Sequence, residues 1–470
     1  MQPLSLATIA DIVGGNLADT PDPGALVTAP LAFDSREPIE RGCLFAALTG
    51  KTADGHDHAK SAVDAGAVAV LATRPIGVPA IVVDDVLDAL GHLAHHLVRT
   101  LDQTTIVAIT GSAGKTSTKD LIAGLLPEAG ATVATHRSFN NEIGLPVTIS
   151  RADLSTDYLV LEMGARHVGH IRDLAQIAPP AIAVVTNVGT AHVGEFGGRD
   201  QIAQAKGELV EALPPGGLAI LNADDERVRA MATRTRARVA TFGLTADATV
   251  HATDVALDAK SRPHFTLHTP EGSARVALQL VGEHQVLNAL AAAAVAREAG
   301  LPPGRSAELL SASTLQSPWR METHQRDDGV TIVNDAYNAN PDSMLKSLGA
   351  LAAMGRGRHQ RTIAVLGHMN ELGADSRAAH EAIGRAAAQL GLDQLVTVGG
   401  DEARWMQQAA RDAGAASALQ VPDQNAALAR LRSTLRPGDV VLVKASRGVQ
   451  LQQLAEALLQ PDPEGDLTTA

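Results

Sequence analysis

The chain has few aromatic residues and almost no cysteine. Aromatic side chains make up 2% of its 470 residues, although hydrophobic residues make up 45%. We therefore expect cores built from aliphatic side chains. Because Cys43 is the one cysteine, an intramolecular disulfide and a thiolate metal cage are both excluded, and a reducing compartment is expected.

Long apolar runs and an excess of positive charge are also missing. The longest apolar stretch, Leu287–Ala296, is half the length that a membrane-spanning helix needs. The segment Met1–Gly15 lacks the basic start and apolar run of a secretory signal. With 39 basic and 52 acidic residues, the formal charge of -13 repels phosphate backbones and anionic lipids. We expect a cytoplasmic protein that neither binds nucleic acid nor inserts into a membrane.

Short β-rich apolar runs alternate with helix-like stretches along the chain. This alternation predicts an α/β protein with mostly parallel sheets. The expected strands are Ala67–Leu71, Thr105–Thr110, Tyr158–Met163, Ala181–Asn187, Ile363–Leu366, Leu395–Gly399 and Val440–Lys444.

Two joints divide the chain into three expected domains. A polar stretch at 99–104 precedes a new strand, and Ser-Pro-Trp at 317–319 follows a helical stretch. We predict a smaller N-terminal α/β domain, a central phosphate-loop ATPase-type domain with a mostly parallel sheet, and a C-terminal Rossmann-like βαβ domain. Their bounds are 1–102, 103–317 and 318–460, and residues 461–470 are expected to form a disordered tail.

A glycine-rich loop follows the predicted strand Thr105–Thr110. Its residues are Gly111, Ser112, Ala113, Gly114, Lys115, Thr116 and Ser117, and a helical run, Thr118–Leu126, comes next. Such a loop turns backbone N–H groups toward phosphate, while Lys115 adds positive charge and Thr116 a hydroxyl for Mg²⁺. Ile109 stands where the common form has glycine, so an ordinary glycine turn with a solvated lysine is the alternative. The flanking strand and helix favour phosphate binding.

Possible metal ligands follow the neighbouring predicted strands. Glu162 ends one of them, and His192 follows another. Ligands gather at the carboxyl ends of parallel strands, so both can reach the glycine loop, and a carboxylate suits Mg²⁺. Taken singly, Glu162 could be a surface charge, His192 a structural histidine, and Lys206 a solvated lysine on a helix.

Several segments occur in the order typical of one enzyme family. They are Thr110–Lys119, Phe139–Pro146, Leu161–Gly164, Ala191–His192, Ala205–Glu208, Asn288–Ala292, Asn334–Pro341 and Lys444–Gly448. Over nearly the whole chain they resemble the Mur ligases, ATP-dependent amide-forming enzymes of peptidoglycan synthesis. The first hundred residues agree, because Asp34–Arg36, Gly42–Leu48 and Asp54–His56 resemble a uridine-nucleotide-binding domain.

The resemblance implies both substrates and mechanism. Phe139–Gly144 and Asp335–Pro341 are most similar to the member that joins D-alanyl-D-alanine to UDP-N-acetylmuramoyl-tripeptide, and the Asp-Asn-Pro-Arg motif of the preceding ligase does not occur. ATP would convert the tripeptide carboxylate to an acyl phosphate, which the amine attacks, releasing ADP and phosphate. A monomer is expected. Whether the third peptide residue is meso-diaminopimelate or lysine is left open.

The resemblance also implies roles for individual residues. Lys115, His192 and Lys206 would be catalytic, and Thr116, Glu162, His192 and a carbamylated Lys206 would hold two Mg²⁺ ions. ATP would contact residues 111–117, Asn288, Arg320 and Asp335. The other substrates would contact Ser35, Arg36, Asp54, His56, Asn141, Asn338, Lys444 and Arg447.

Three positions depart from the family pattern, namely Gln285, His368 and Ala445. They put details of the adenine and C-terminal contacts in doubt. The sequence also bears on two rival functions. A folylpolyglutamate synthetase would lack the first hundred residues, and an inactive nucleotide-binding protein would lack Lys115, Glu162 or His192, all of which are present.

Overall fold

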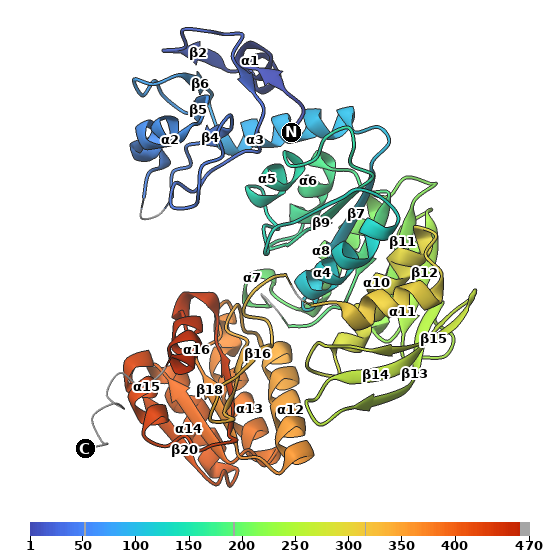
Figure 1. The fold of residues 1–470 in the computed structure, drawn as a ribbon, viewed down its shortest axis with the longest axis vertical. Helices are drawn as coiled ribbons and strands as arrows, with labels where there is room; N and C mark the ends of the chain where they lie inside the picture. Colours follow the sequence, from blue (N-terminus) through green and yellow to red (C-terminus); the bar gives the residue numbers. More distant parts are fainter. Residues whose placement is uncertain (51–52, 191–192, 315, 461–470) are drawn as a thin grey trace.

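Three larger β-sheets follow one another along the chain, each with its own helices (Figure 1). The computed structural model describes residues 1–50, 53–190, 193–314 and 316–460. The expected tail at 461–470 lies outside these described residues. The α/β class with mostly parallel sheets is confirmed, while the domain boundaries at 102 and 317 stay predictions.

The first sheet has the strand order β2-β6-β5-β4, with β2 antiparallel to its neighbour, and a small β1-β3 pair accompanies it. Its elements are β1 (Leu4–Ser5), α1 (Leu6–Val13), β2 (Asn16–Ala18), β3 (Leu26–Val27), β4 (Leu44–Ala46), a 3-10 turn (Gly55–His58), α2 (Ala59–Ala65), β5 (Ala69–Ala72), β6 (Ala80–Val82) and α3 (Val86–Thr100). Helix α3 contacts α5 and α6 of the next unit, so the two units share one aliphatic core.

The second sheet has nine strands in the order β15-β14-β13-β12-β11-β10-β7-β9-β8. All neighbours from β8 to β13 are parallel, and β13, β14 and β15 form an antiparallel extension. The strands are β7 (Thr105–Thr110), β8 (Thr132–Ala134), β9 (Tyr158–Glu162), β10 (Ile182–Val185), β11 (Leu218–Asn222), β12 (Arg238–Gly243), β13 (Val250–Leu257), β14 (Pro263–Thr269) and β15 (Gly272–Ala277).

Helices cover both faces of the parallel part of this sheet. They are α4 (Lys115–Leu125), α5 (Gly144–Ile149), α6 (His170–Ile177), α7 (Val193–Phe196), α8 (Arg199–Glu211), α9 (Glu226–Ala230), α10 (Gln285–Glu298) and α11 (Pro303–Ala312), with 3-10 turns at Leu126–Glu128 and Met231–Arg234. Burial on both faces explains the continuous apolar runs of the central strands. The alanine run 291–294 on α10 is buried in the same aliphatic core as α4, and these small side chains allow the two helices to lie close together.

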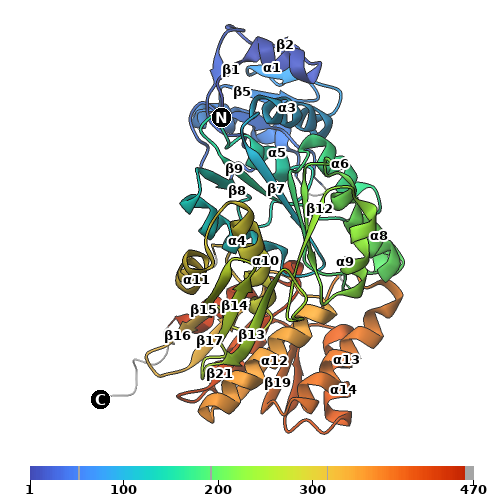
Figure 2. The ribbon, with the colours of Figure 1, turned by 90° about the vertical axis from the view of Figure 1, so that its right-hand side faces the viewer.

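The third sheet has the order β16-β17-β21-β18-β19-β20, and only β16 is antiparallel to its neighbour. Its elements are β16 (Glu322–Gln325), β17 (Thr331–Asn334), α12 (Pro341–Arg358), β18 (Thr362–Leu366), a 3-10 turn (Gly373–Asp375), α13 (Ser376–Gln389), β19 (Gln394–Val398), α14 (Asp401–Asp412), β20 (Ala418–Val421), α15 (Gln424–Arg432), β21 (Val440–Lys444), a 3-10 turn (Arg447–Val449) and α16 (Gln452–Leu459). The antiparallel extension of the second sheet reaches toward this unit (Figure 2), and a Cβ placed on Gly357 of α12 would lie 3.2 Å from Ala259 Cα.

All seven predicted strands are present, with ends shifted by up to two residues. The helix after the glycine loop begins at Lys115, three residues before the predicted start. The antiparallel extension β13-β14-β15 was not predicted. Within the described ranges, no helix combines the length and apolar character needed to cross a bilayer.

Strand order determines where a ligand can bind. Strands β7 and β10 are neighbours, but the chain continues from β7 toward β8 on one side of this pair and from β10 toward β11 on the other, which opens a crevice at their carboxyl ends. The carboxyl ends of β17, β18 and β21 of the third sheet line the same crevice through the residues that follow them.

Helices α13 and α14 cross closely at Gly384, where an added Cβ would lie 2.0 Å from Met406 O. We expect Gly384→Ala to lower the free energy of unfolding by about 1–3 kcal/mol, because the helices must separate. Gly349→Ala on α12 is the matched control, since no atom lies within 4 Å of its added Cβ. It should stabilise the protein by up to about 1 kcal/mol. Urea unfolding followed by circular dichroism tests both, and equal midpoints would contradict the expectation.

Candidate active site

The glycine loop has a conformation that excludes larger side chains. Gly111 has a φ of 154° and Gly114 a φ of 82°. A Cβ on Gly111 would lie 1.8 Å from Thr186 Oγ1, and one on Gly114 would lie 2.4 Å from Asn288 Oδ1. Lys115 opens α4, and its Nζ donates a hydrogen bond of 2.8 Å to Gly111 O. Backbone N–H groups at the start of α4 are therefore available to an anion.

Residues at the end of β10 hold the loop in this shape. Asn187 Oδ1 accepts the N–H of Ala113 at 2.9 Å, and Asn187 Nδ2 donates to Ala113 O at 2.9 Å. Thr186 Oγ1 donates to the same carbonyl at 2.7 Å. Because hydrogen bonds hold both the N–H and the carbonyl of Ala113, the loop has this shape before any ligand binds.

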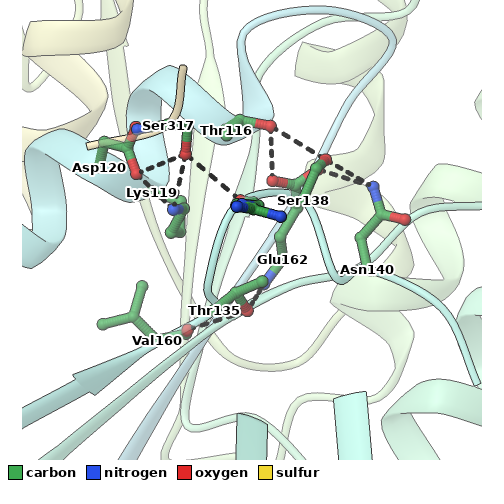
Figure 3. A network of polar contacts seen from close by, with 10 residues as sticks. Thr116, Lys119, Asp120, Thr135, Ser138, Asn140, Val160, Glu162 and Ser317 are labelled. Atoms are coloured by element: carbon green, nitrogen blue, oxygen red, sulfur yellow. Dashed lines mark hydrogen bonds and ion pairs between the residues drawn. The ribbon is translucent and has the colours of Figure 1, made fainter. Parts of the chain in front are cut away.

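Glu162, at the end of β9, is fully buried. Its side chain lies among those of Thr116, Ser138 and Asn140 (Figure 3). Its carboxylate accepts hydrogen bonds from Thr116 Oγ1 at 2.7 Å, Ser138 Oγ at 2.9 Å and Asn140 Nδ2 at 2.7 Å. Burial by itself raises the pKa of Glu162, but nearby Lys115 and Arg320 and the donated hydrogen bonds outweigh it, so the pKa is lowered.

Two lysines of the site, the partly buried Lys115 and the buried Lys206, have lowered pKa values. Burial lowers the pKa of Lys115, helped by the charge of Arg320 and opposed by Glu162. Burial and the charge of Lys115 lower the pKa of Lys206, on α8, well below its ordinary value. No hydrogen bond or ion pair reaches the Lys206 amine from the described residues, which leave out 191–192. The predicted ligand His192 lies outside the described residues.

One cavity of about 380 Å³ collects most of the predicted site residues from two sheets. The central unit contributes Ser112, Ala113, Gly114, Lys115, Thr116, Ser117, Asn141, Glu162, Lys206 and Asn288; the connection and third unit contribute Arg320, Asp335, Asn338, Lys444 and Arg447. Gly111 is not part of the lining but contacts it through Lys115.

The side of the cavity formed by the third sheet is rich in cations. Lys444 Nζ donates to Asp335 Oδ2 at 2.7 Å and to Asn338 O at 2.9 Å, so these residues hold one another. The guanidinium carbon of Arg320 lies 4.2 Å from the centroid of the Tyr337 ring, and that of Arg447 lies 5.2 Å from it. Cations stacked on a ring keep their donors free for an anion.

The predicted residues of the first sheet lie outside this cavity lining. Arg36 pairs with Asp34 at 2.7 Å. Asp54 Oδ1 lies 2.6 Å from His56 Nδ1, and Arg74 donates to the other oxygen at 3.0 Å. No hydrogen bond is formed by the Ser35 side chain within the described part of the chain. A uridine site there stays a prediction.

The departures from the family pattern have local structural roles. Gln285 Oε1 accepts a hydrogen bond from Asn288 Nδ2 at 2.8 Å, so Gln285 orients Asn288, the residue predicted to contact adenine. The backbone carbonyl of His368 accepts a hydrogen bond from the Ser446 N–H. The His368 side chain is not part of the cavity lining. A Cβ on Gly367 would lie 2.7 Å from the Ala445 Cβ, so these two small residues lie together.

Several lining residues were missed from the sequence. They are Ser138, Asn140, Arg166, His170, Thr186, Lys346, Asn370 and Glu371. Asn140 lies within the quoted Phe-Asn-Asn-Glu motif, which offered a signal. Asn370 and Glu371 lie in the segment Gly367–Gly373, which keeps the frame of a family motif apart from His368.

The others stand in loops or on helices and have no spacing that distinguishes them from solvated polar residues.

Three family models match the chain in sequence order. They are the Mur ligase family catalytic domain at residues 33–97, the Mur ligase middle domain at 109–296, and the Mur ligase glutamate ligase domain at 319–447. The matches include strands of all three larger sheets.

Relatives and solved structures agree with these matches. A UDP-N-acetylmuramoyl-tripeptide--D-alanyl-D-alanine ligase of Mycobacterium bovis is 49% identical over 99% of both chains, and that of Escherichia coli is 35% identical over 97% of this chain and 98% of its own. MurF from Acinetobacter baumannii superposes with a TM-score of 0.85 at 30% identity, covering 98% of this chain and all of the other. MurF from Thermotoga maritima in complex with ADP gives 0.78 at 30% identity, covering 92% and 97%.

The close approach of Gly114 to Asn288 predicts that the loop tolerates no side chain there. Gly114→Ala should abolish binding of a fluorescent ATP analogue, because the added Cβ meets Asn288 Oδ1 and strains a φ of 82°. Gly216→Ala is the control, with no atom within 4 Å of its Cβ. Unchanged affinity in a folded Gly114→Ala protein would contradict this description of the loop.

Proposed function

We propose, from the premise that this chain belongs to the Mur ligase family, that its central cavity joins D-alanyl-D-alanine to UDP-N-acetylmuramoyl-tripeptide at the expense of ATP. The observation that carries this function is the meeting in one cavity of a phosphate loop, a buried carboxylate, and lysine and arginine side chains from a second sheet. The enzyme is an ATP-dependent ligase of peptidoglycan precursor synthesis.

The chemistry explains why cations surround the cavity. A carboxylate resists amine attack until its oxygen becomes a leaving group, and transfer of the γ-phosphoryl group to it gives an acyl phosphate. The amine of D-alanyl-D-alanine then forms the amide bond and phosphate leaves. Both the γ-phosphate and the carboxylate are anions, so charge neutralisation and alignment are the main tasks of the protein. We assign these tasks to Lys115, Arg320 and Arg447, and their presence in the cavity lining supports the assignment.

The donor set fits Mg²⁺. Thr116 Oγ1 and the Glu162 carboxylate are oxygen ligands 2.7 Å apart, and the hydrogen bonds from Ser138 and Asn140 fix the carboxylate. Oxygen donors of this kind suit a hard cation. Mg²⁺ supplies charge neutralisation between phosphate oxygens when bound. We assign one ion to Thr116 and Glu162, and a second to Glu162, His192 and Lys206.

Lys206 suits the second ion only as a carbamate. An ammonium buried beside Lys115 has no counter-charge among the residues that the structure describes, and such burial is costly. The neutral amine forms an N–C bond to carbon dioxide and loses one proton to solvent, which gives an anionic carbamate whose oxygens can bind metal and removes the repulsion. The burial of Lys206 and the nearby Lys115 charge support this modification.

The remaining roles follow from position. We assign Asn288 to the adenine, Asp335 to the ribose and connection, and Asn141, Asn338, Lys444 and Arg447 to substrate carboxylates or phosphates. The uridine nucleotide is assigned to Ser35, Arg36, Asp54 and His56. All these residues belong to one chain, which supports a monomer, and the need for ATP supports a cytoplasmic site of action.

A phosphate-release assay tests the function. Phosphate should appear only when ATP, Mg²⁺, UDP-linked tripeptide and D-alanyl-D-alanine are all present. Lys115→Ala should lower turnover on the order of 10³-fold, because a charge-stabilising group of phosphoryl transfer is removed. Tripeptides with meso-diaminopimelate or lysine as third residue can be compared in parallel. Near-wild-type ligation by folded Lys115→Ala protein would overturn the site assignment.

The carbamate predicts chemical rescue. Lys206→Ala should be nearly inactive, and a small carboxylic acid should restore part of the phosphate release by placing oxygens where the carbamate stood. Lys60→Ala, which removes an exposed lysine, should retain full activity and show no response to the acid. An active, metal-loaded enzyme whose crystal map shows an unmodified Lys206 would refute the carbamate.

A further inference from the structure

Two adjacent charged residues of α4 are buried together behind the phosphate loop. Lys119 and Asp120 have side chains that are 3% and 1% exposed, and they form an ion pair (Figure 3). Neighbouring positions on a helix point in different directions. Their contact therefore requires both side chains to bend toward a common point, and that point is Ser317.

Ser317 lies in the connection between the second and third sheets. Its N–H donates to Asp120 Oδ2 at 2.9 Å and its hydroxyl donates to Asp120 Oδ1 at 3.1 Å. The same hydroxyl accepts from Lys119 Nζ at 3.3 Å. Hydrogen bonds therefore join Ser317 to Lys119 and Asp120, although Ser317 and Asp120 are 197 residues apart in the sequence.

Stability alone does not explain a cluster of this kind. Apolar residues of similar volume can replace a buried ion pair with little loss of stability, whereas buried polar groups can define one geometry among several. The geometry that this cluster defines is the position of the connection relative to the phosphate loop, because α4 begins at Lys115.

The connection beyond Ser317 is bent and strained around Arg320. Trp319 has a φ of 61° and Met321 a φ of 54°, which are unfavourable for residues other than glycine. The far end of the bend is also held, since the Met321 N–H donates to Asp335 Oδ1 at 3.1 Å. Backbone strain persists only where surrounding contacts impose it.

The bend presents Arg320 to the cavity. Arg320 lines the same cavity as Lys115 and Glu162, and its guanidinium lies on the face of Tyr337. Its buried Nε has no hydrogen-bond partner among the described residues. An arginine with an unused donor, held beside a phosphate loop, fits a phosphoryl oxygen.

We propose that Asp120 and Ser317 are positioning residues that hold Arg320 against the phosphate loop during phosphoryl transfer. This role rests on the proposed function, because it requires that Arg320 act on the transferred group. Asp120 anchors the connection from the second sheet, Asp335 anchors it from the third, and Arg320 lies between the two anchors.

Ser317→Ala tests the proposal, since it removes the hydroxyl but keeps the N–H bond to Asp120 and leaves Lys119 paired. We expect kcat to fall about 10- to 100-fold, because small misplacements of an aligning group have effects of that size. The KM for ATP should change less than about twofold, because the lost interaction is used in the transition state. Replacing Asp120 itself would leave the Lys119 charge buried without a partner and could prevent folding.

A double-mutant cycle identifies the residue through which Ser317 acts. In an Arg320→Ala background, adding Ser317→Ala should lower kcat no further than about twofold, since coupled residues are not additive. The control is Ser311→Ala on α11, whose hydroxyl accepts from the Ala277 N–H at 3.0 Å away from the cavity. It should leave kcat unchanged in both backgrounds.

Different results would contradict the positioning role of Ser317 and the proposed ligase function. If wild-type enzyme is active and Ser317→Ala lowers only the unfolding midpoint, or if its effect multiplies that of Arg320→Ala, the positioning role is overturned while the proposed function stands. If wild-type enzyme releases no phosphate with the stated substrates, the proposed function falls and this role falls with it.

Discussion

A carboxylate sealed away from water stays ionised only where cations and donors surround it, and Glu162 is in that position. Hydrogen bonds from Thr116, Ser138 and Asn140 reach it from α4 and from the segment that follows β8. Lys115 and Arg320 supply the positive charge. Removing any of these groups would leave a buried anion undercompensated, so the carboxylate ties the phosphate loop, the end of β9 and the interdomain connection into one arrangement.

The same electrostatic requirement explains why the site is divided between two sheets. The second sheet supplies a rigid anion cradle, because Asn187 and Thr186 grip Ala113 before ligands bind. Lys444 and Arg447 of the third unit and Arg320 of the connection line the other side of the same cavity, where like charges close together would repel one another. The ion pair with Asp335 offsets the repulsion between Lys444 and the arginines. Arg320 and Arg447 lie near the ring of Tyr337, which attracts both of them at this side of the cavity.

The sequence allowed the fold and the centre of the site to be predicted because both depend on local patterns. Buried parallel strands read as apolar runs, and the glycine loop has a fixed spacing after β7. The extension β13-β14-β15 was missed because its strands bury one face only, so their buried residues are separated by polar ones, as in β14, and form none of the continuous apolar runs from which the other strands were predicted. The Lys119–Asp120–Ser317 cluster could not be predicted, since its members look like helix-surface charges and a loop serine until the fold brings them together.

Because aromatic residues are scarce in this chain, the presence of Tyr337 in the cavity lining needs a specific explanation. Only two tyrosines occur in the chain, and large rings are not needed to fill cores built from leucine, isoleucine, valine and alanine. Tyr337 has two guanidinium groups near its ring, and its hydroxyl lies 3.2 Å from Arg447 Nη1. An aliphatic side chain could fill the same space, but an aromatic ring attracts both cations and, apart from the Arg447 Nη1 that donates to the Tyr337 hydroxyl, leaves their N–H groups for phosphate and carboxylate oxygens. Tyr337, one of the few aromatic residues of this chain, therefore orients the guanidinium groups of Arg320 and Arg447 in the cavity where the anionic substrates would react.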